Sequence, residues 1–255
     1  MSSIMVFGAN CLVGIESYKV LTLKHKVTPC VDTVESKERF LGLIGKETDH
    51  DVRTSVAVAD VKASQRCRKA IALAAPDVVI YCIGSYPYPD HPQDPKFWTE
   101  LISDGFESLS TTVDLLPARP RPTFIVIGST TSDLLADNSG KIRPPFWSMI
   151  ESFANAHHHL QKRIGELRCK SKDPNERRII HHLRIPALLV GSSFYKHISA
   201  GVRSGSKCTT VKAILAELTL ICNHYQSLTE SEDIDVADRN CKDTTINSAE
   251  VAVLA

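Results

Sequence analysis

Along most of the chain, short apolar runs alternate with longer stretches whose apolar residues recur every three or four positions. The short runs are typical of buried parallel strands, and the periodic stretches are typical of amphipathic helices. This alternation predicts βαβ units with right-handed crossovers, and hence an α/β fold: a doubly wound parallel sheet with helices on both faces. The predicted strands are Ile4–Phe7, Lys26–Val31, Thr54–Val58, Asp77–Cys82, Thr123–Ile127 and Ile179–Leu183, and the predicted helices are Leu12–Leu23, Lys37–Ile44, Ala63–Ala74, Trp98–Leu116, Phe146–Arg168 and Thr210–His224.

A glycine turn joins the first predicted strand to the first helix. Gly8 ends the apolar run, and Gly14 follows six residues later, inside the start of the helix. A helix that begins in this way directs its N-terminal N–H groups at an anion, such as the pyrophosphate of a dinucleotide. Cys11 stands where the dinucleotide fingerprint has a small residue, so weaker cofactor binding is expected. The expected cofactor contacts in this turn are Gly8, Asn10, Cys11, Leu12 and Val13.

Three polar or proline-rich stretches follow predicted strands four, five and six, at 85–95, 133–145 and 187–207. Ligands of open α/β sheets bind at the carboxyl ends of the strands, so these stretches are the candidate walls of a substrate site. Aromatic side chains in such walls serve as stacking surfaces. The candidate substrate-binding residues are Tyr86, Tyr88, His91, Phe146 and Trp147.

The chain length of 255 residues suits a single domain. We expect a dinucleotide-binding core at 1–185 and a C-terminal, substrate-side segment at 186–255. The tail from Glu230 onward carries seven carboxylates against Arg239 and Lys242. Two interpretations of this tail stay open: a last strand and helix, or partial disorder.

Charge and cysteine usage narrow the class of protein. The net charge of +1 gives no global electrostatic reason to expect nucleic acid or membranes as partners. The eight cysteines are scattered without metal-ligand spacing, so no metal site is predicted, and several lie in apolar runs as small core residues. With no signal peptide and no long apolar span in the sequence, these features favour a cytoplasmic protein that acts on a small molecule as a monomer or homodimer.

Several motifs, in order along residues 1–225, resemble the atypical short-chain dehydrogenase/reductases, in particular the NmrA-like and biliverdin/flavin-reductase-like branch. The family's G-A-T-G-x-x-G start is similar to the segment 8–14, with Asn10 and Cys11 as departures, and its helical K-x-x-x-E pattern is similar to Lys162 and Glu166. The family's strand-six L-R-P signature is similar to 183–186. The resemblance implies a Rossmann-type fold, an NAD(P)(H) cofactor, adenine contacts at Asp60 and Val61, and nicotinamide-ribose contacts at Cys82, Ile83 and Gly84.

The resemblance also implies a catalytic centre, but this chain departs from it. Most members use Tyr-x-x-x-Lys, and no tyrosine of this chain is followed by lysine four residues later. Lys162 stands where the family lysine is expected, as a ribose contact, and His158 stands four residues before it. Residues four apart share a helix face, so His158 is a candidate general acid beside Lys162. Ser129 matches the serine that orients the substrate carbonyl.

Asp32 follows the second predicted strand, where NADP-preferring relatives carry a basic residue. A carboxylate accepts hydrogen bonds from ribose hydroxyls and repels a 2′-phosphate. Asp32 therefore favours NAD(H) over NADP(H), while Lys37 and Arg39 lie near enough in sequence to oppose that preference.

Three functions remain open. The leading one is an NAD(P)-dependent reductase or dehydrogenase acting on a small aromatic or polycyclic substrate of specialised metabolism. The second is a non-redox cyclase or isomerase on the same fold, which the missing tyrosine and the altered glycine turn would suit. The third is a dinucleotide-sensing regulator without catalytic activity.

Overall fold

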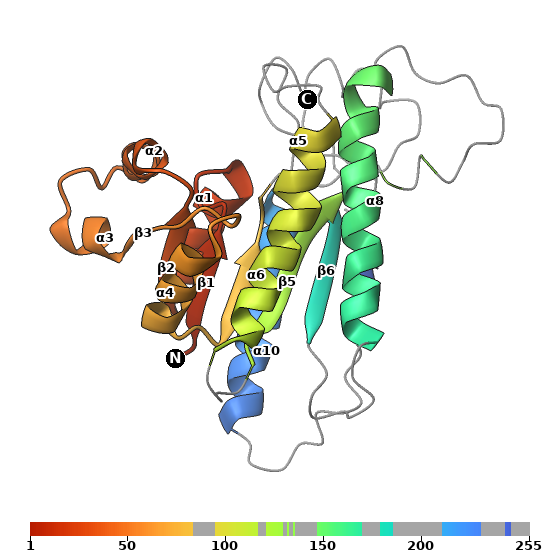
Figure 1. Ribbon diagram of the computed structural model, residues 1–255. Helices are drawn as coiled ribbons and strands as arrows, with labels where there is room; N and C mark the ends of the chain where they lie inside the picture. The colour runs from red at the N-terminus through yellow and green to blue at the C-terminus, as the bar shows by residue number, and fades with distance from the viewer. Residues whose placement is uncertain are drawn as a thin grey trace, which may run out of the picture.

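A seven-stranded, wholly parallel sheet forms the centre of the protein (Figure 1). The structure is a computed structural model that describes residues 1–83, 95–116, 121–129, 132, 135, 147–169, 179–185, 211–230 and 243–245. The strand order is β3-β2-β1-β4-β5-β6-β7, so the chain reverses its direction of winding between β1 and β4. The prediction of a doubly wound parallel sheet is confirmed. The strands are β1 Ser3–Phe7, β2 Lys26–Val31, β3 Ala57–Val58, β4 Val78–Tyr81, β5 Thr123–Ser129, β6 Ile180–Ile185 and β7 Asp243–Thr245.

One face of the sheet is covered by α1 (Leu12–Leu21), α2 (Val34–Ile44) and α10 (Val211–Glu230). Their buried side chains form one core cluster with alternate residues of the strands, which is the pattern that a sheet covered on both faces requires. Val13 from α1, Phe40 from α2 and Ile214 from α10 are members of this cluster.

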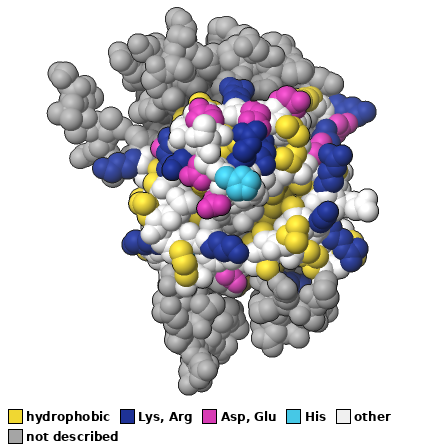
Figure 2. All heavy atoms as spheres, turned by 90° about the vertical axis from the view of Figure 1, so that its left-hand side faces the viewer, with side chains coloured by type: hydrophobic (Ala, Val, Ile, Leu, Met, Phe, Trp, Pro, Cys, Tyr) yellow, Lys and Arg dark blue, Asp and Glu magenta, His cyan; other side chains and the backbone are white. Residues whose placement is uncertain are grey.

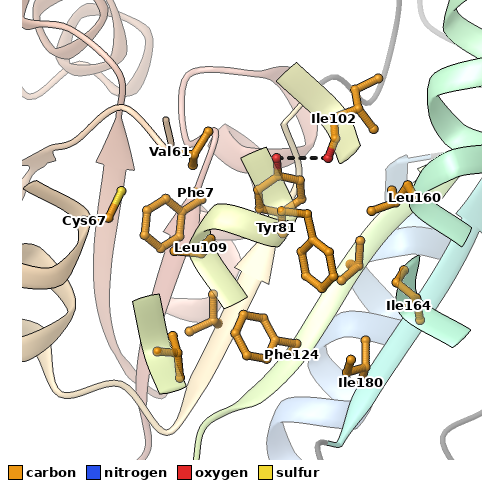
Figure 3. Packing of buried hydrophobic residues seen from close by; sticks show 14 of the residues in the cluster. Phe7, Val61, Cys67, Tyr81, Ile102, Leu109, Phe124, Leu160, Ile164 and Ile180 are labelled. Carbon is orange, nitrogen blue, oxygen red and sulfur yellow. Dashed lines mark hydrogen bonds between the residues drawn. The ribbon is translucent and has the colours of Figure 1, made fainter. Parts of the chain in front are cut away.

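The opposite face is covered by α4 (Ser64–Ala74), by the continuous helix α5–η1–α6, and by α8 (Trp147–Cys169) (Figure 1). Figure 3 shows the second core cluster, in which Phe7, Tyr81 and Phe124 from the sheet meet side chains of these helices. Tyr81 is fully buried, and its hydroxyl donates to the backbone oxygen of Leu101 at 2.9 Å and lies 3.3 Å from that of Ile102. Burial raises the pKa of Tyr81 well above its ordinary value.

The helix predicted as one element at 98–116 contains a π-turn. It consists of α5 (Pro95–Thr99), the π-helix η1 (Glu100–Asp104) and α6 (Gly105–Asp114). The N–H of Gly105 donates to the oxygen of Glu100, five residues back, as a π-helix requires. Gly105 suits this place because a Cβ there would lie 2.8 Å from the Tyr81 hydroxyl and 2.9 Å from Val61.

Two predicted elements differ from the structure. The third strand, predicted at Thr54–Val58, is only Ala57–Val58, and it follows a short helix α3 at His50–Ser55. The Asp49 side chain accepts from the N–H of Val52 at 3.1 Å, so a local N-cap starts a helix before the β-branched residues can extend a strand. In the tail, β7 pairs with β6, so the interpretation as a last strand is confirmed for Asp243–Thr245.

The side of the molecule that carries α2 and α3 shows acidic and basic side chains intermixed around small hydrophobic patches (Figure 2). Two of the ion pairs there are Arg53–Glu38 and Lys46–Asp49. In the described part of the chain, no helix is both long enough and apolar enough to cross a lipid bilayer.

Candidate functional site

The glycine turn between β1 and α1 is held by backbone contacts within the turn and with β2. Gly8 has a φ of +80°, a conformation that side chains disfavour, and the N–H groups of Gly8 and Ala9 both donate to the oxygen of Cys30 at 3.2 Å. A Cβ on Gly14 would lie 2.4 Å from the oxygen of Gly8 and 2.8 Å from the Cα of Ala9. Both glycines are therefore needed to bring α1 against the end of β1. The helix then presents its first N–H groups, those of Leu12 and Val13, without acceptors in their own helix.

Cys11 is the N-cap residue of this helix. Its thiol sulfur accepts from the N–H of Gly14 at 3.3 Å, and its S–H donates to the backbone oxygen of Cys82 at 3.4 Å. The side chain is half-buried and is directed at the end of β4. The sequence-based expectation that it obstructs the pyrophosphate remains a prediction, but the thiol serves here as a helix cap.

Cys82 and Ile83 follow β4 at the point where the winding of the sheet reverses, which is where open α/β sheets bind ligands. The Cys82 thiol is fully buried and donates to the oxygen of Phe7 at 3.0 Å. A Cβ on Gly8 would lie 3.0 Å from the Ile83 side chain, so the two strand ends are closely packed. The neighbouring Cys11 thiol, together with burial, holds the pKa of the Cys82 thiol well above its ordinary value.

Asp32 lies immediately after β2, two residues beyond the Cys30 carbonyl that closes the glycine turn. Its side chain is exposed, and its Oδ1 accepts from the N–H of Thr33 at 3.0 Å. The carboxylate thus lies just beyond the end of β2, the strand adjacent to the turn. Of the two nearby cations, Lys37 donates to the oxygen of Val56 at 3.5 Å.

Asp60 and Val61 form the connection from β3 to α4. Asp60 accepts from the N–H of Lys62 at 2.9 Å, which fixes a local turn, and Val61 is buried in the second core cluster. Both residues therefore have a structural role in this connection, whether or not they contact a cofactor.

Ser129 is the last residue of β5, is buried, and pairs with Ile185 at the end of β6. Ser132 extends this polar edge, because its hydroxyl lies 3.2 Å from the oxygen of Ser129 and 3.4 Å from Oε1 of Gln161 on α8. The guanidinium of Arg184 donates to the Ser132 hydroxyl at 3.4 Å. No local motif in the sequence marks Ser132 or Gln161, since their contact depends on how α8 packs over the strand ends.

On α8 the inward-facing histidine is His157, one position before the candidate His158. His158 and Lys162 share a face, as predicted, but both are exposed, whereas His157 is buried and packs on Phe153 with ring centroids 4.4 Å apart. Neighbouring helical residues are turned by about 100° from each other, so an offset of one position changes the face. The buried face comprises Phe153, His157, Leu160, Ile164 and Leu167.

Phe153 and His157 are an inward-facing pair four residues apart on this face. Phe153 also packs edge-on against Trp98 of α5, with centroids 5.2 Å apart. A Tyr-x-x-x-Lys pair that faces the sheet would need two inward-facing positions four residues apart. Phe153 and His157 are such positions, and Phe153 lacks the hydroxyl that a tyrosine would supply. The apolar spacing of α8 was the signal in the sequence that would have placed His157 inward.

Several candidate residues lie outside the described residues: Gly84, Tyr86, Tyr88, His91 and Phe146. Trp147 begins α8, and its side chain is likewise outside the description. The predicted substrate contacts at these positions stay predictions.

No protein-family model matches the chain, and no curated protein sequence matches it significantly. Solved structures do. Gre2 from Candida albicans in complex with NADPH is 12% identical, with 97% of this chain and 78% of that chain covered and a TM-score of 0.63. UDP-glucose-4-epimerase from Stenotrophomonas maltophila with bound NAD is 12% identical, with 89% and 75% covered and a TM-score of 0.61.

A third similar structure is dTDP-4-dehydrorhamnose reductase from Bacillus anthracis in complex with NADP, which is 12% identical over 88% of this chain and 71% of that chain, with a TM-score of 0.54. At such identities the likeness speaks for the fold. It agrees with the helix-covered parallel sheet described above. The chain therefore has a Rossmann fold of the kind found in these NAD(P)-bound reductase and epimerase structures, in line with its resemblance to atypical short-chain dehydrogenase/reductases.

Proposed function

We propose that the chain binds a nicotinamide dinucleotide at the β1–α1 turn and acts as an NAD(P)-dependent reductase or dehydrogenase on a small substrate. The proposal rests on the closely packed backbone of the β1–α1 turn, which lies where the winding of the sheet reverses. A Cβ on Gly14 would lie 2.4 Å from the Gly8 oxygen, and the N–H groups of Leu12 and Val13 remain as donors for phosphate oxygens. The residues present thus fit a pyrophosphate.

Asp32 supports NAD(H) as the preferred form. Its exposed carboxylate follows β2, the strand beside the glycine turn, where it can accept from both hydroxyls of an adenine ribose. A 2′-phosphate in the same place would bring two anions together. The ammonium of Lys37 donates to the backbone oxygen of Val56 at 3.5 Å.

A nicotinamide cofactor supplies hydride transfer when it is bound, and the chain must position the substrate and manage a proton. Ser129 ends β5 and can donate its hydroxyl hydrogen to a carbonyl oxygen at the strand edge. His157 lies on the inward, buried face of α8, and an imidazole can donate or accept a proton. We assign these two residues the roles that Ser129 and His158 had in the sequence-based hypothesis.

One observation favours a second candidate function, non-redox catalysis such as cyclisation or isomerisation. Phe153 is the inward-facing residue four positions before His157, and it is packed between Trp98 and His157 without a hydroxyl. A site that lacks the tyrosine proton donor can still orient a substrate and use His157 as acid or base. A small aromatic or polycyclic substrate suits either candidate, and that expectation depends on Tyr86, Tyr88 and Phe146.

Calorimetric titration with NAD⁺, NADH, NADP⁺ and NADPH tests the cofactor site. We expect NADH to bind, and we expect Asp32→Ala to weaken NADH binding by about tenfold, the equivalent of one charge-assisted hydrogen bond. Asp51→Ala removes an exposed carboxylate from α3 and is the matched control, with unchanged affinity. If none of the four nucleotides binds, the proposed dinucleotide site is wrong.

Turnover distinguishes the candidate functions. A panel of aromatic ketones and aldehydes is followed by nicotinamide absorbance and by product analysis. Oxidation of NADH in step with product supports the reductase, and product without absorbance change supports the non-redox candidate. His157→Gln is expected to reduce either turnover by about a hundredfold or more, whereas His158→Gln and Lys162→Ala, which alter the exposed face, leave it within about twofold. A loss confined to the exposed-face variants would return the assignment to His158 and Lys162.

A further inference from the structure

Two cysteines from distant parts of the chain meet at the glycine turn. Cys11 caps α1, and Cys82 follows β4, yet the Cys11 sulfur lies only 3.4 Å from the backbone oxygen of Cys82. The Cys82 sulfur in turn lies 3.0 Å from the oxygen of Phe7 and 3.5 Å from that of Gly8. Both thiols therefore occupy the few ångströms between the ends of β1 and β4.

The two thiols differ in the way that a reactive dithiol pair requires. Cys11 is half-buried, so its sulfur is partly accessible, and at the N-terminus of α1 it accepts a hydrogen bond from the N–H of Gly14. Cys82 is fully buried, and its pKa is raised, so it stays protonated until a partner sulfur reaches it. An accessible attacking thiolate beside a buried second thiol is the arrangement of thiol–disulfide exchange.

We propose that Cys11 and Cys82 form a reversible disulfide, with a small disulfide such as oxidised glutathione as the oxidant. The Cys11 thiolate attacks one sulfur of the oxidant, which gives a mixed disulfide and releases one glutathione thiolate. That thiolate takes up the proton of the Cys82 thiol, and the Cys82 sulfur then attacks the Cys11 sulfur and releases a second glutathione. Two protein thiols are oxidised, and one glutathione disulfide is reduced to two thiols.

The disulfide alters the turn that the proposed function requires, and this coupling rests on that proposed function. To bond with Cys82, the Cys11 sulfur must leave the N–H of Gly14, so α1 loses its N-cap. The Cys82 sulfur likewise leaves the carbonyl oxygens of Phe7 and Gly8. We expect the oxidised protein to bind NADH at least about tenfold more weakly, since cap and turn geometry both change.

The other described cysteines offer controls. Cys30 and Cys67 are both buried, and burial raises the pKa of Cys67 to about 11, so neither supplies an accessible thiolate. Cys169 is exposed at the end of α8, and its variant Cys169→Ser checks for oxidation of a surface thiol.

The test treats the full chain with oxidised glutathione and maps its peptides by mass spectrometry. We expect a peptide crosslink between Cys11 and Cys82 in the wild type, reversed by dithiothreitol. Cys82→Ala is expected to stop at a stable glutathione adduct on Cys11, and Cys11→Ser, which keeps an N-cap oxygen, is expected to leave Cys82 unmodified. Bound NADH should slow the reaction of the wild type.

Each contrary result overturns a specific part of the proposal, either the disulfide or its coupling to NADH binding. Modification of Cys169 without a Cys11–Cys82 crosslink overturns the disulfide, as does a Cys11 adduct that persists in the wild type as it does in Cys82→Ala. A crosslink that leaves NADH affinity within about twofold overturns the coupling. If the reduced protein binds no nucleotide, the proposed function fails, while the crosslink result still decides the disulfide by itself.

Discussion

Replacing Gly14 by alanine tests the tight contact between α1 and β1. The new Cβ would lie 2.4 Å from the Gly8 oxygen, 2.8 Å from the Ala9 Cα and 3.0 Å from its carbonyl carbon. All three are backbone atoms, so no side chain can rotate away, and α1 must move from the end of β1. Overpacking of this kind costs about 1–3 kcal/mol, and we place this backbone clash at the upper end.

The same substitution brings an opposing gain, because alanine is favoured over glycine inside a helix by about 1 kcal/mol. The net expectation for Gly14→Ala is a loss of about 2 kcal/mol, which lowers Tm by about 4–8 °C in a chain of this size. Gly165→Ala is the matched control, since its Cβ would have no neighbour within 4 Å near the C-terminal end of α8. This variant should keep the helix gain alone and raise Tm by about 2–4 °C.

Thermal unfolding and urea titration of both variants beside the wild type measure the difference. The reasoning requires opposite signs for the two substitutions. If Gly14→Ala is as stable as Gly165→Ala, the close approach of α1 and β1 does not exist in solution. The pyrophosphate site inferred from that approach would then be wrong as well.

Gly128→Ala should destabilise the chain by about 1–3 kcal/mol in urea unfolding, because its Cβ would lie 2.2 Å from Nε2 of the buried His182. Adding His182→Ala should remove most of the clash, so strictly additive effects of the two substitutions on stability would contradict this account. Tyr81→Phe should lose about 1–2 kcal/mol in thermal unfolding, since its hydroxyl donates to the Leu101 oxygen at 2.9 Å; no loss would mean that the bond contributes nothing. Burial raises the pKa of Cys222 from 9.0 to about 12, so its contribution to stability is present below about pH 9 and is lost as the pH rises through about 12. Urea midpoints at about pH 8 and about pH 10.5 should therefore differ less in Cys222→Ala than in the wild type, and equal differences would refute this account.

The parts of the fold that depend on local pattern were predictable from the sequence. Buried strands contain short apolar runs, such as residues 124–127 of β5, and the glycine turn is indicated by Gly8 and Gly14. The short third strand was less accessible, because Asp49 caps a helix in a stretch whose side chains also suit a strand. Local capping and β propensity competed there, and the cap decided the outcome.

The site was harder, because its contacts join distant segments. The orientation of the Cys11 thiol depends on Cys82, which is 71 residues away, and that of Gln161 depends on Ser132. The choice of His158 followed the spacing from Lys162, whereas the burial of Leu160 and Ile164 shows that the neighbouring register faces the sheet. The spacing of apolar residues along the whole helix indicates its orientation more reliably than a single pair of residues that matches a family motif.

The π-turn at Glu100–Asp104 behaves like one inserted residue in an otherwise α-helical segment. Each residue turns an α-helix by about 100°, so deleting one residue here would restore regular winding and rotate everything before it by that angle. Trp98 would then leave its edge-on contact with Phe153, and α5 would present a different stripe to α8. A one-residue insertion or deletion in this short segment would thus change which side chains of α5 pack against α8 while the strands below stay in register.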